Sequence, residues 1–143
     1  MIGLIQGVNN AIAPGKRPLS SMSPTIVTKN GRIFMVIGSP GGSRIITITL
    51  EAILNVIDHG MDIQAAIDAP RIHEQWMPDI IYAEPGALSP EARSQLAAMG
   101  YSITDQQGWG AAEGIEIGAG PGGARILVGA NDNRRPAGAA TGY

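Results

Sequence analysis

Two apolar runs in the first third of the chain have the pattern of paired strands. Residues 25–28 and 33–38 are rich in β-branched side chains, and Lys29-Asn30-Gly31-Arg32 lies between them. Asn-Gly is a strong hairpin signal because both residues tolerate a positive φ angle. The pattern therefore predicts a β-hairpin that turns at Asn30-Gly31.

The next apolar run, residues 44–59, has a helical period. Its first part, 46–50, also alternates as a strand would, but the length of the run and the stop at Gly60 favour a helix. We expect this helix, which begins near Ser43, to cover the sheet that contains the hairpin. Glu51 and Asp58 then fall on its solvated face.

A second helix is clearly signalled at Ser89-Pro90-Glu91. Serine is a favoured N-cap, proline suits the first helical position, and an acidic residue suits the first turn. Ala92, Leu96 and Met99 are spaced as its apolar stripe, and Gly100 ends it. Elsewhere we expect a helix at 62–68 capped by Asp62, strands at 80–83, 101–104, 114–117 and 125–130, and irregular structure over 1–24.

This order of elements requires helices and sheets together, in an α+β or layered α/β arrangement. A length of 143 residues fits one domain or a piece of a larger one. The net charge of −2 argues against a general nucleic-acid binder, which usually carries a basic stripe. The absence of cysteine excludes disulfides, thiolate zinc sites and a cysteine nucleophile. No apolar run reaches ~18 residues, so no transmembrane helix is expected.

The first candidate site is the glycine-rich segment 38–44, between a predicted strand and a predicted helix. Gly41 and Gly42 let the backbone approach a ligand closely, and a helix start adds unpaired N–H groups. The pair suits an anion, which could be a phosphate or the oxyanion of an acyl intermediate. The segment matches neither nucleotide-binding glycine motif. A plain strand-to-helix turn without a ligand is the alternative interpretation.

The second candidate is the loop that holds Ser20 and Ser21. Their hydroxyl groups can donate hydrogen bonds to a carboxylate, or the loop can simply be solvated. His59, Asp62, His73 and Glu74 match no familiar metal-ligand spacing, so we expect packing or surface histidines and no metal site.

Several stretches, taken in order, resemble the gamma-glutamyltranspeptidases. The two longest are Lys16-Arg17-Pro18-Leu19-Ser20-Ser21-Met22-Ser23-Pro24-Thr25 and Gly38-Ser39-Pro40-Gly41-Gly42-Ser43-Arg44-Ile45-Ile46. Shorter matches lie at 55–60, 69–73 and 138–143. Together they run over nearly the whole chain.

The resemblance implies an N-terminal-nucleophile hydrolase fold, an αββα layered sandwich, made from a precursor that cleaves itself into two subunits. A new N-terminal threonine attacks the gamma-glutamyl amide of glutathione and related compounds, and water, an amino acid or a peptide accepts the acyl group. Ser20 and Ser21 match the serines that bind the glutamyl carboxylate. Gly41 and Gly42 match the glycines whose N–H groups form the oxyanion hole. No cofactor or metal is implied.

The resemblance covers only the C-terminal part of the family's small subunit. We therefore expect residues 1–143 to be a single partial domain, an incomplete fragment, with 1–24 as an irregular substrate-binding segment. The family's nucleophile lies upstream of the matched part, so we expect this chain alone to be inactive. Its expected partners are the upstream part and the large subunit. Near the end, Asp132-Asn133-Arg134 departs from the family's usual Asp-Pro-Arg.

Two further expectations follow from the partial match. Uncovered sheet edges and apolar surface predict self-association between copies. The complete protein is expected to be periplasmic or extracellular, by resemblance. The alternatives to a share in gamma-glutamyl transfer are a folded, non-catalytic fragment that acts only in assembly with the upstream half, and a phosphate-binding module.

Overall fold

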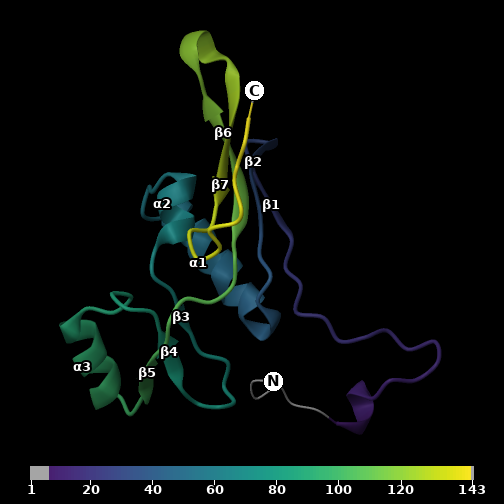
Figure 1. The fold of residues 1–143 in the computed structure, drawn as a ribbon, viewed down its shortest axis with the longest axis vertical. Coiled ribbons are helices and arrows are strands. Elements are labelled where there is room, and N and C mark those ends of the chain that lie inside the picture. The colour runs from purple at the N-terminus through teal and green to yellow at the C-terminus, as the bar shows by residue number, and fades with distance from the viewer. Residues whose placement is uncertain (1–6, 143) are drawn as a thin grey trace.

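A computed structural model of the protein describes residues 7–142, which form two sheets and three α-helices (Figure 1). The elements in chain order are a 3-10 turn (Val8–Asn10), β1 (Thr25–Lys29), β2 (Arg32–Gly38), a 3-10 turn (Gly42–Arg44), α1 (Ile45–Ile57), α2 (Ile63–Asp68), β3 (Ile72–His73), β4 (Ile81–Ala83), α3 (Pro90–Ala98), β5 (Ile103–Asp105), β6 (Glu113–Ala119), a 3-10 turn (Pro121–Gly123) and β7 (Arg125–Asn131). The mixture confirms the α+β class.

The larger sheet is antiparallel, with strand order β1-β2-β6-β7. The predicted hairpin forms its first two strands. At the turn, Asn30 has a φ angle of 53° and Gly31 one of 73°, the conformation for which Asn-Gly is favoured. Residues 7–24 form a largely irregular arm that leads into β1 and extends away from the sheets (Figure 1). The first six residues of the predicted irregular segment lie outside the described residues.

Helices α1 and α2 lie on one face of this sheet and close the core (Figure 1). Met35 and Ile37 point inward from β2 and pack with Ile48 and Ala52 of α1 and Ile63 of α2. The predicted covering of the hairpin sheet is thus confirmed. The helix itself is shorter than the apolar run, because residues 42–44 form a 3-10 turn and α1 ends at Ile57.

The smaller sheet has the order β3-β4-β5, with β3 and β4 antiparallel and β4 and β5 parallel. Strand β3 has only two residues and was not predicted. Helix α3 begins as predicted, with Ser89 Oγ accepting a hydrogen bond from Ala92 N at 3.1 Å. Its predicted apolar stripe is covered only in part, because Ala92 and Leu96 are half-buried and Met99 is 72% exposed. In the described part of the chain, α3 packs against too little structure to cover that stripe.

The other face of the larger sheet is uncovered in the described chain. Ile26 of β1, Val36 of β2 and Ile115 of β6 are neighbours across the strands, and all three are exposed. Leu127 of β7 is 69% exposed. We call these four residues the outer apolar face. Among residues 7–142, no helix is long and apolar enough to cross a membrane.

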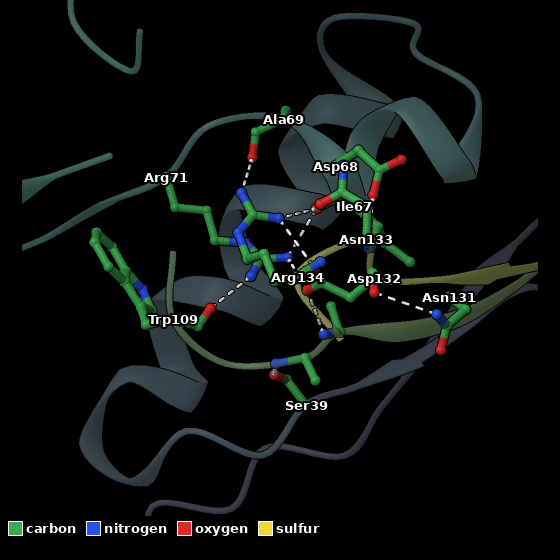
Figure 2. A network of polar contacts seen from close by, with 12 residues as sticks. Ser39, Ile67, Asp68, Ala69, Arg71, Trp109, Asn131, Asp132, Asn133 and Arg134 are labelled. Carbon is green, nitrogen blue, oxygen red and sulfur yellow. Dashed lines mark hydrogen bonds and ion pairs between the residues drawn. The ribbon is translucent and has the colours of Figure 1, made fainter. Parts of the chain in front are cut away.

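Four charged side chains join distant segments: Arg71, Glu84 and Asp132, which are buried, and Arg134, which is partly buried. We call these four residues the ion network. Arg71 Nη2 lies 2.7 Å from Asp132 Oδ2, and Arg134 Nη1 lies 3.1 Å from Asp132 Oδ1 (Figure 2). Arg134 also pairs with Glu84. Two positive and two negative charges therefore balance inside the protein.

Asp132 is completely buried and accepts hydrogen bonds from the backbone N–H groups of Ala112 and Arg134. Burial alone would raise its pKa, but these N–H groups and the Arg71 guanidinium outweigh burial, so the pKa of Asp132 lies below its usual value. The carboxylate is thus held in its charged form, and each charge in the network has a partner.

We expect Asp132→Asn to lower the free energy of unfolding by about 3–5 kcal/mol, because it leaves buried arginine charge without its partner. Urea unfolding of the chain measures the change. The control is Asp105→Asn, which breaks the exposed pair with Arg93 and should cost less than about 1 kcal/mol. Equal losses in both variants would show that the ion network does not act as a buried unit.

Candidate active site

The predicted glycine loop connects β2 to α1 and has a backbone that only glycine adopts readily. Gly41 has a φ angle of 156° and Gly42 one of 62°. A side chain at Gly41 would begin 2.9 Å from Ile48 Cδ1, whereas one at Gly42 would meet nothing within 4 Å. Gly41 therefore rests on the core, and Gly42 faces open space.

The amide groups of this loop are available to a ligand. Within residues 7–142, neither the N–H of Gly41 nor that of Gly42 has a hydrogen-bond acceptor. The loop also precedes the 13-residue helix α1, whose N-terminal end carries partial positive charge. Free N–H groups at a helix start can bind a negatively charged oxygen.

The predicted serine pair meets this loop. Ser21 Oγ donates a hydrogen bond to the carbonyl oxygen of Gly42 at 2.8 Å. Ser20 is exposed, and its Oγ accepts a hydrogen bond from Met22 N at 3.2 Å, which leaves its own proton free to be donated. The structure thus brings together two of the sequence candidates that lie 21 residues apart.

A buried arginine, Arg44, lies two residues after Gly42. The guanidinium of Arg44 lies over the rings of Tyr82 and Trp109, at 4.9 and 4.7 Å from their centroids. Its Nη2 donates to Gln106 Oε1 at 2.9 Å, and no carboxylate among residues 7–142 pairs with it. Burial lowers the pKa of Arg44, although arginine keeps its charge. The guanidinium is therefore held by two aromatic rings and an amide rather than by an opposite charge.

The loop is supported from behind by residues 109–112. Ser39 Oγ accepts a hydrogen bond from Ala111 N at 3.3 Å. Gly110 lies so close that a Cβ there would be 2.5 Å from Ile48 Cδ1 and 3.2 Å from the carbonyl oxygen of Pro40. Trp109 and Ala112 are in turn held by the ion network, through the Trp109 carbonyl and the Ala112 N–H (Figure 2).

The placement predicted for Glu51 is wrong. Its Oε1 accepts a hydrogen bond from Ile72 N at 2.9 Å, and its Oε2 is buried without a partner in the described chain. Burial raises the pKa of Glu51 to about 7. The helical period placed it opposite the sheet, but strand β3 crosses that side of α1 and covers it.

The four residues considered as metal ligands do not form a cluster. Asp62 caps α2 by accepting from Ala65 N, and His59 is exposed beyond the end of α1. His73 is buried between the hydroxyl of Thr47 and the amide of Gln75. Among the described residues, no group of three potential ligands surrounds a metal position.

Sequence reasoning missed Arg44, Glu51 and the ion network. Two stretches carried the available signal. Ala69-Pro70-Arg71 lies in a stretch that resembles the family, and Asp132-Asn133-Arg134 departs from the family's usual Asp-Pro-Arg. Their mutual contact could not be read from those stretches, since the partners are 61 residues apart.

Comparison with solved structures defines the class of protein. The fold superimposes on a gamma-glutamyltranspeptidase of Helicobacter pylori, a T380A mutant, with a TM-score of 0.85 and 45% identity over 92% of this chain and 70% of that one. A gamma-glutamyltranspeptidase of Pseudomonas nitroreducens complexed with L-DON gives a TM-score of 0.78 and 40% identity over 99% of this chain and 70% of that one. The fold is that of the N-terminal-nucleophile transpeptidases.

Sequence comparison then gives the family. The family model described as Gamma-glutamyltranspeptidase matches residues 2–142, and the chain belongs to this family. It is 53% identical over 148 aligned positions to the glutathione hydrolase proenzyme of Pseudomonas sp. strain A14, covering 100% of the chain and 26% of that protein. For the Escherichia coli K12 proenzyme, identity is 45%, with 99% of the chain and 23% of that protein covered. The chain thus spans about a quarter of the length of these relatives.

We expect Glu51→Gln to stabilise the chain at pH 8 by about 1–3 kcal/mol and to have little effect at pH 4. The folded-state pKa of about 7 lies above the ordinary 4.5, so wild-type stability is complete below pH 4.5 and falls as the pH rises through 7. Glutamine keeps the acceptor for Ile72 N and never ionises. Urea unfolding at both pH values measures this, with the exposed Glu91→Gln as control. A gain of equal size at both pH values would contradict it.

Proposed function

We propose that this chain is part of a gamma-glutamyl transferase/hydrolase that cleaves the gamma-glutamyl amide of glutathione and related compounds. The chain contributes two parts of the active site. The N–H groups of Gly41 and Gly42 form the oxyanion hole, and Ser20 and Ser21 bind the carboxylate of the glutamyl group. The observation that carries the proposal is the pair of free amides at the start of the 3-10 turn that leads into α1, tied to the serine loop through Ser21 and Gly42. The acyl acceptor is water, an amino acid or a peptide.

The chemistry of acyl transfer matches this geometry. When a nucleophile attacks the amide carbonyl, its oxygen gains negative charge that must be stabilised in the transition state. Two N–H donors on a backbone held by core packing do so without reorganising. The threonine nucleophile of the family belongs to the part of the relatives that this chain does not span. The proposed partners are therefore that upstream part and the large subunit.

The assembly role remains the second candidate, and the outer apolar face favours it. Four exposed apolar side chains on one sheet face provide a surface that a further layer would cover. In this alternative the chain is a folded, non-catalytic fragment that acts only together with the upstream half.

A chimaeric enzyme separates the two candidates. Residues 1–143 replace the matched segment of the Pseudomonas sp. A14 proenzyme, which is 53% identical to the chain. Hydrolysis of γ-glutamyl-p-nitroanilide by the purified, processed chimaera supports the catalytic share. A processed, folded chimaera without turnover supports a role in assembly alone.

In this chimaera, we expect Gly42→Val to lower kcat by about 10²–10³-fold with little change in KM, because an oxyanion donor acts in the transition state. The control is Gly60→Val, since Gly60 has a φ angle of 65° and open space like Gly42 but follows the far end of α1. Near-normal kcat in Gly42→Val would overturn the oxyanion assignment.

The two serines should differ in effect. Ser20→Ala removes a free donor to the substrate carboxylate, so donor KM should rise about 10–100-fold, which corresponds to a charged hydrogen bond of roughly 1.5–3 kcal/mol. Ser21→Ala also releases the carbonyl of Gly42, so kcat should fall as well. An analogue without the α-carboxylate is the control substrate. Equal losses on both substrates would make the serines structural.

We expect the 143-residue chain to self-associate through the outer apolar face. Static light scattering at increasing concentration should show a rising mass, and Leu127→Lys should reduce it. A control, Met99→Lys on the exposed end of α3, should leave the association unchanged. A monomer at high concentration would contradict this expectation.

A further inference from the structure

A chain of hydrogen bonds leads from the glycine loop to a segment more than thirty residues away. Ser43, which directly follows Gly42, donates from Oγ to Gln75 Oε1 at 2.7 Å. Gln75 is itself oriented, because its Nε2 donates to the carbonyl oxygen of Met77 at 2.8 Å. The amide oxygen of Gln75 is therefore aimed at Ser43 rather than free to turn away.

A buried histidine completes this chain. His73 Nε2 lies 2.9 Å from the same Oε1, and His73 Nδ1 lies 2.9 Å from Thr47 Oγ1 on α1. Because an amide oxygen can only accept, Nε2 carries the proton. The single hydroxyl proton of Thr47 is shared between the carbonyl oxygen of Arg44, at 3.0 Å, and Nδ1 of the neutral ring. Burial is the largest influence on His73 and lowers its pKa, which favours this neutral form.

These hydrogen bonds hold the 3-10 turn that precedes α1 and the first turn of α1 itself. Ser43 is held through Gln75, Thr47 is one turn further along and is held through His73, and both partners come from the same short segment, 73–75. Gly41 and Gly42 have no side chains, so hydrogen bonds from other segments can fix the loop only through its backbone and its flanking residues. Ser21 holds the Gly42 carbonyl on one side, and Gln75 holds Ser43 on the other.

We propose that Gln75 and His73 are positioning residues for the oxyanion hole, acting through Ser43 to hold the N–H groups of Gly41 and Gly42 in their catalytic direction. The inference rests on the proposed function of those amides. Neither side chain needs to touch the substrate. A small change in the direction of an oxyanion donor reduces transition-state stabilisation far more than ground-state binding.

The test is a double-mutant cycle in the chimaeric enzyme. Gln75→Ala and Ser43→Ala should each lower kcat by about 10–100-fold with KM nearly unchanged. The double variant should be little worse than either single variant, because both remove the same contact. Ser43→Thr keeps the hydroxyl and should restore most of kcat. Gln95→Ala, on the exposed face of α3, is the matched control.

A merely structural role predicts different results. Additive losses, a rise in KM with kcat unchanged, or unchanged kinetics in Ser43→Ala would each overturn the proposal. Thermal unfolding of each variant identifies loss of fold, and Ser43→Ala removes only one oxygen atom, so it tests the contact even where Gln75→Ala unfolds the enzyme.

A second measurement does not depend on activity. In ¹H–¹⁵N spectra of the 143-residue chain, Gln75→Ala should shift the Gly42 and Ser43 amide signals and accelerate their hydrogen exchange, while Gln95→Ala leaves them in place. Unchanged Gly42 signals would overturn the positioning role. If the wild-type chimaera is inactive but the expected spectral changes occur, the proposed function is contradicted, while the contact between Gln75 and the glycine loop is supported.

Discussion

The pairing of Arg71 with Asp132 is the interaction on which the rest of the structure depends. Both side chains are almost fully removed from solvent, so neither charge has water to stabilise it, and each must be satisfied by the protein. Arg71 also donates to the carbonyl groups of Ile67 and Trp109. One guanidinium therefore joins the end of α2, the loop before β6 and the turn after β7. Its hydrogen bonds are directional, so they orient these three segments, which a single hydrophobic contact could not do.

The ion network also makes the candidate site rigid. The ion network fixes the backbone of residues 109–112, and this backbone lies against Pro40 and Ile48. Ile48 in turn lies beneath Gly41. The rear of the glycine loop is thus packed to van der Waals contact, while Gly42 and the exposed Ser20 are open at the front. A rigid rear and an open front are what binding of a developing oxyanion requires.

The larger sheet is asymmetric in a way that fits a part of a larger assembly. Its inner face is closed by α1 and α2, whereas Ile26, Val36 and Ile115 remain exposed on its outer face. The chain spans about a quarter of its curated relatives, and the proposed partners belong to the remainder. The same uncovered face underlies the expected self-association, since apolar surface of this kind favours any partner that removes it from water.

The sequence alone determined the features that depend on neighbouring residues. Asn30-Gly31 set the hairpin through the φ angles that these residues tolerate, and the caps at Asp62 and Ser89 set two helix starts through local hydrogen bonds. The glycine and serine motifs also identified the family, because their spacing is local.

Tertiary structure alone decided which polar groups became buried. Helical period placed Glu51 on a solvated face and Leu96 and Met99 on one apolar stripe. In the structure β3 covers Glu51, whereas Leu96 is only half-buried and Met99 is exposed, since α3 packs against little in the described chain. The contacts of Arg71 with Asp132 and of Ser43 with Gln75 likewise join residues 61 and 32 positions apart. Burial and long-range pairing depend on where distant segments meet, and no local preference contains that information.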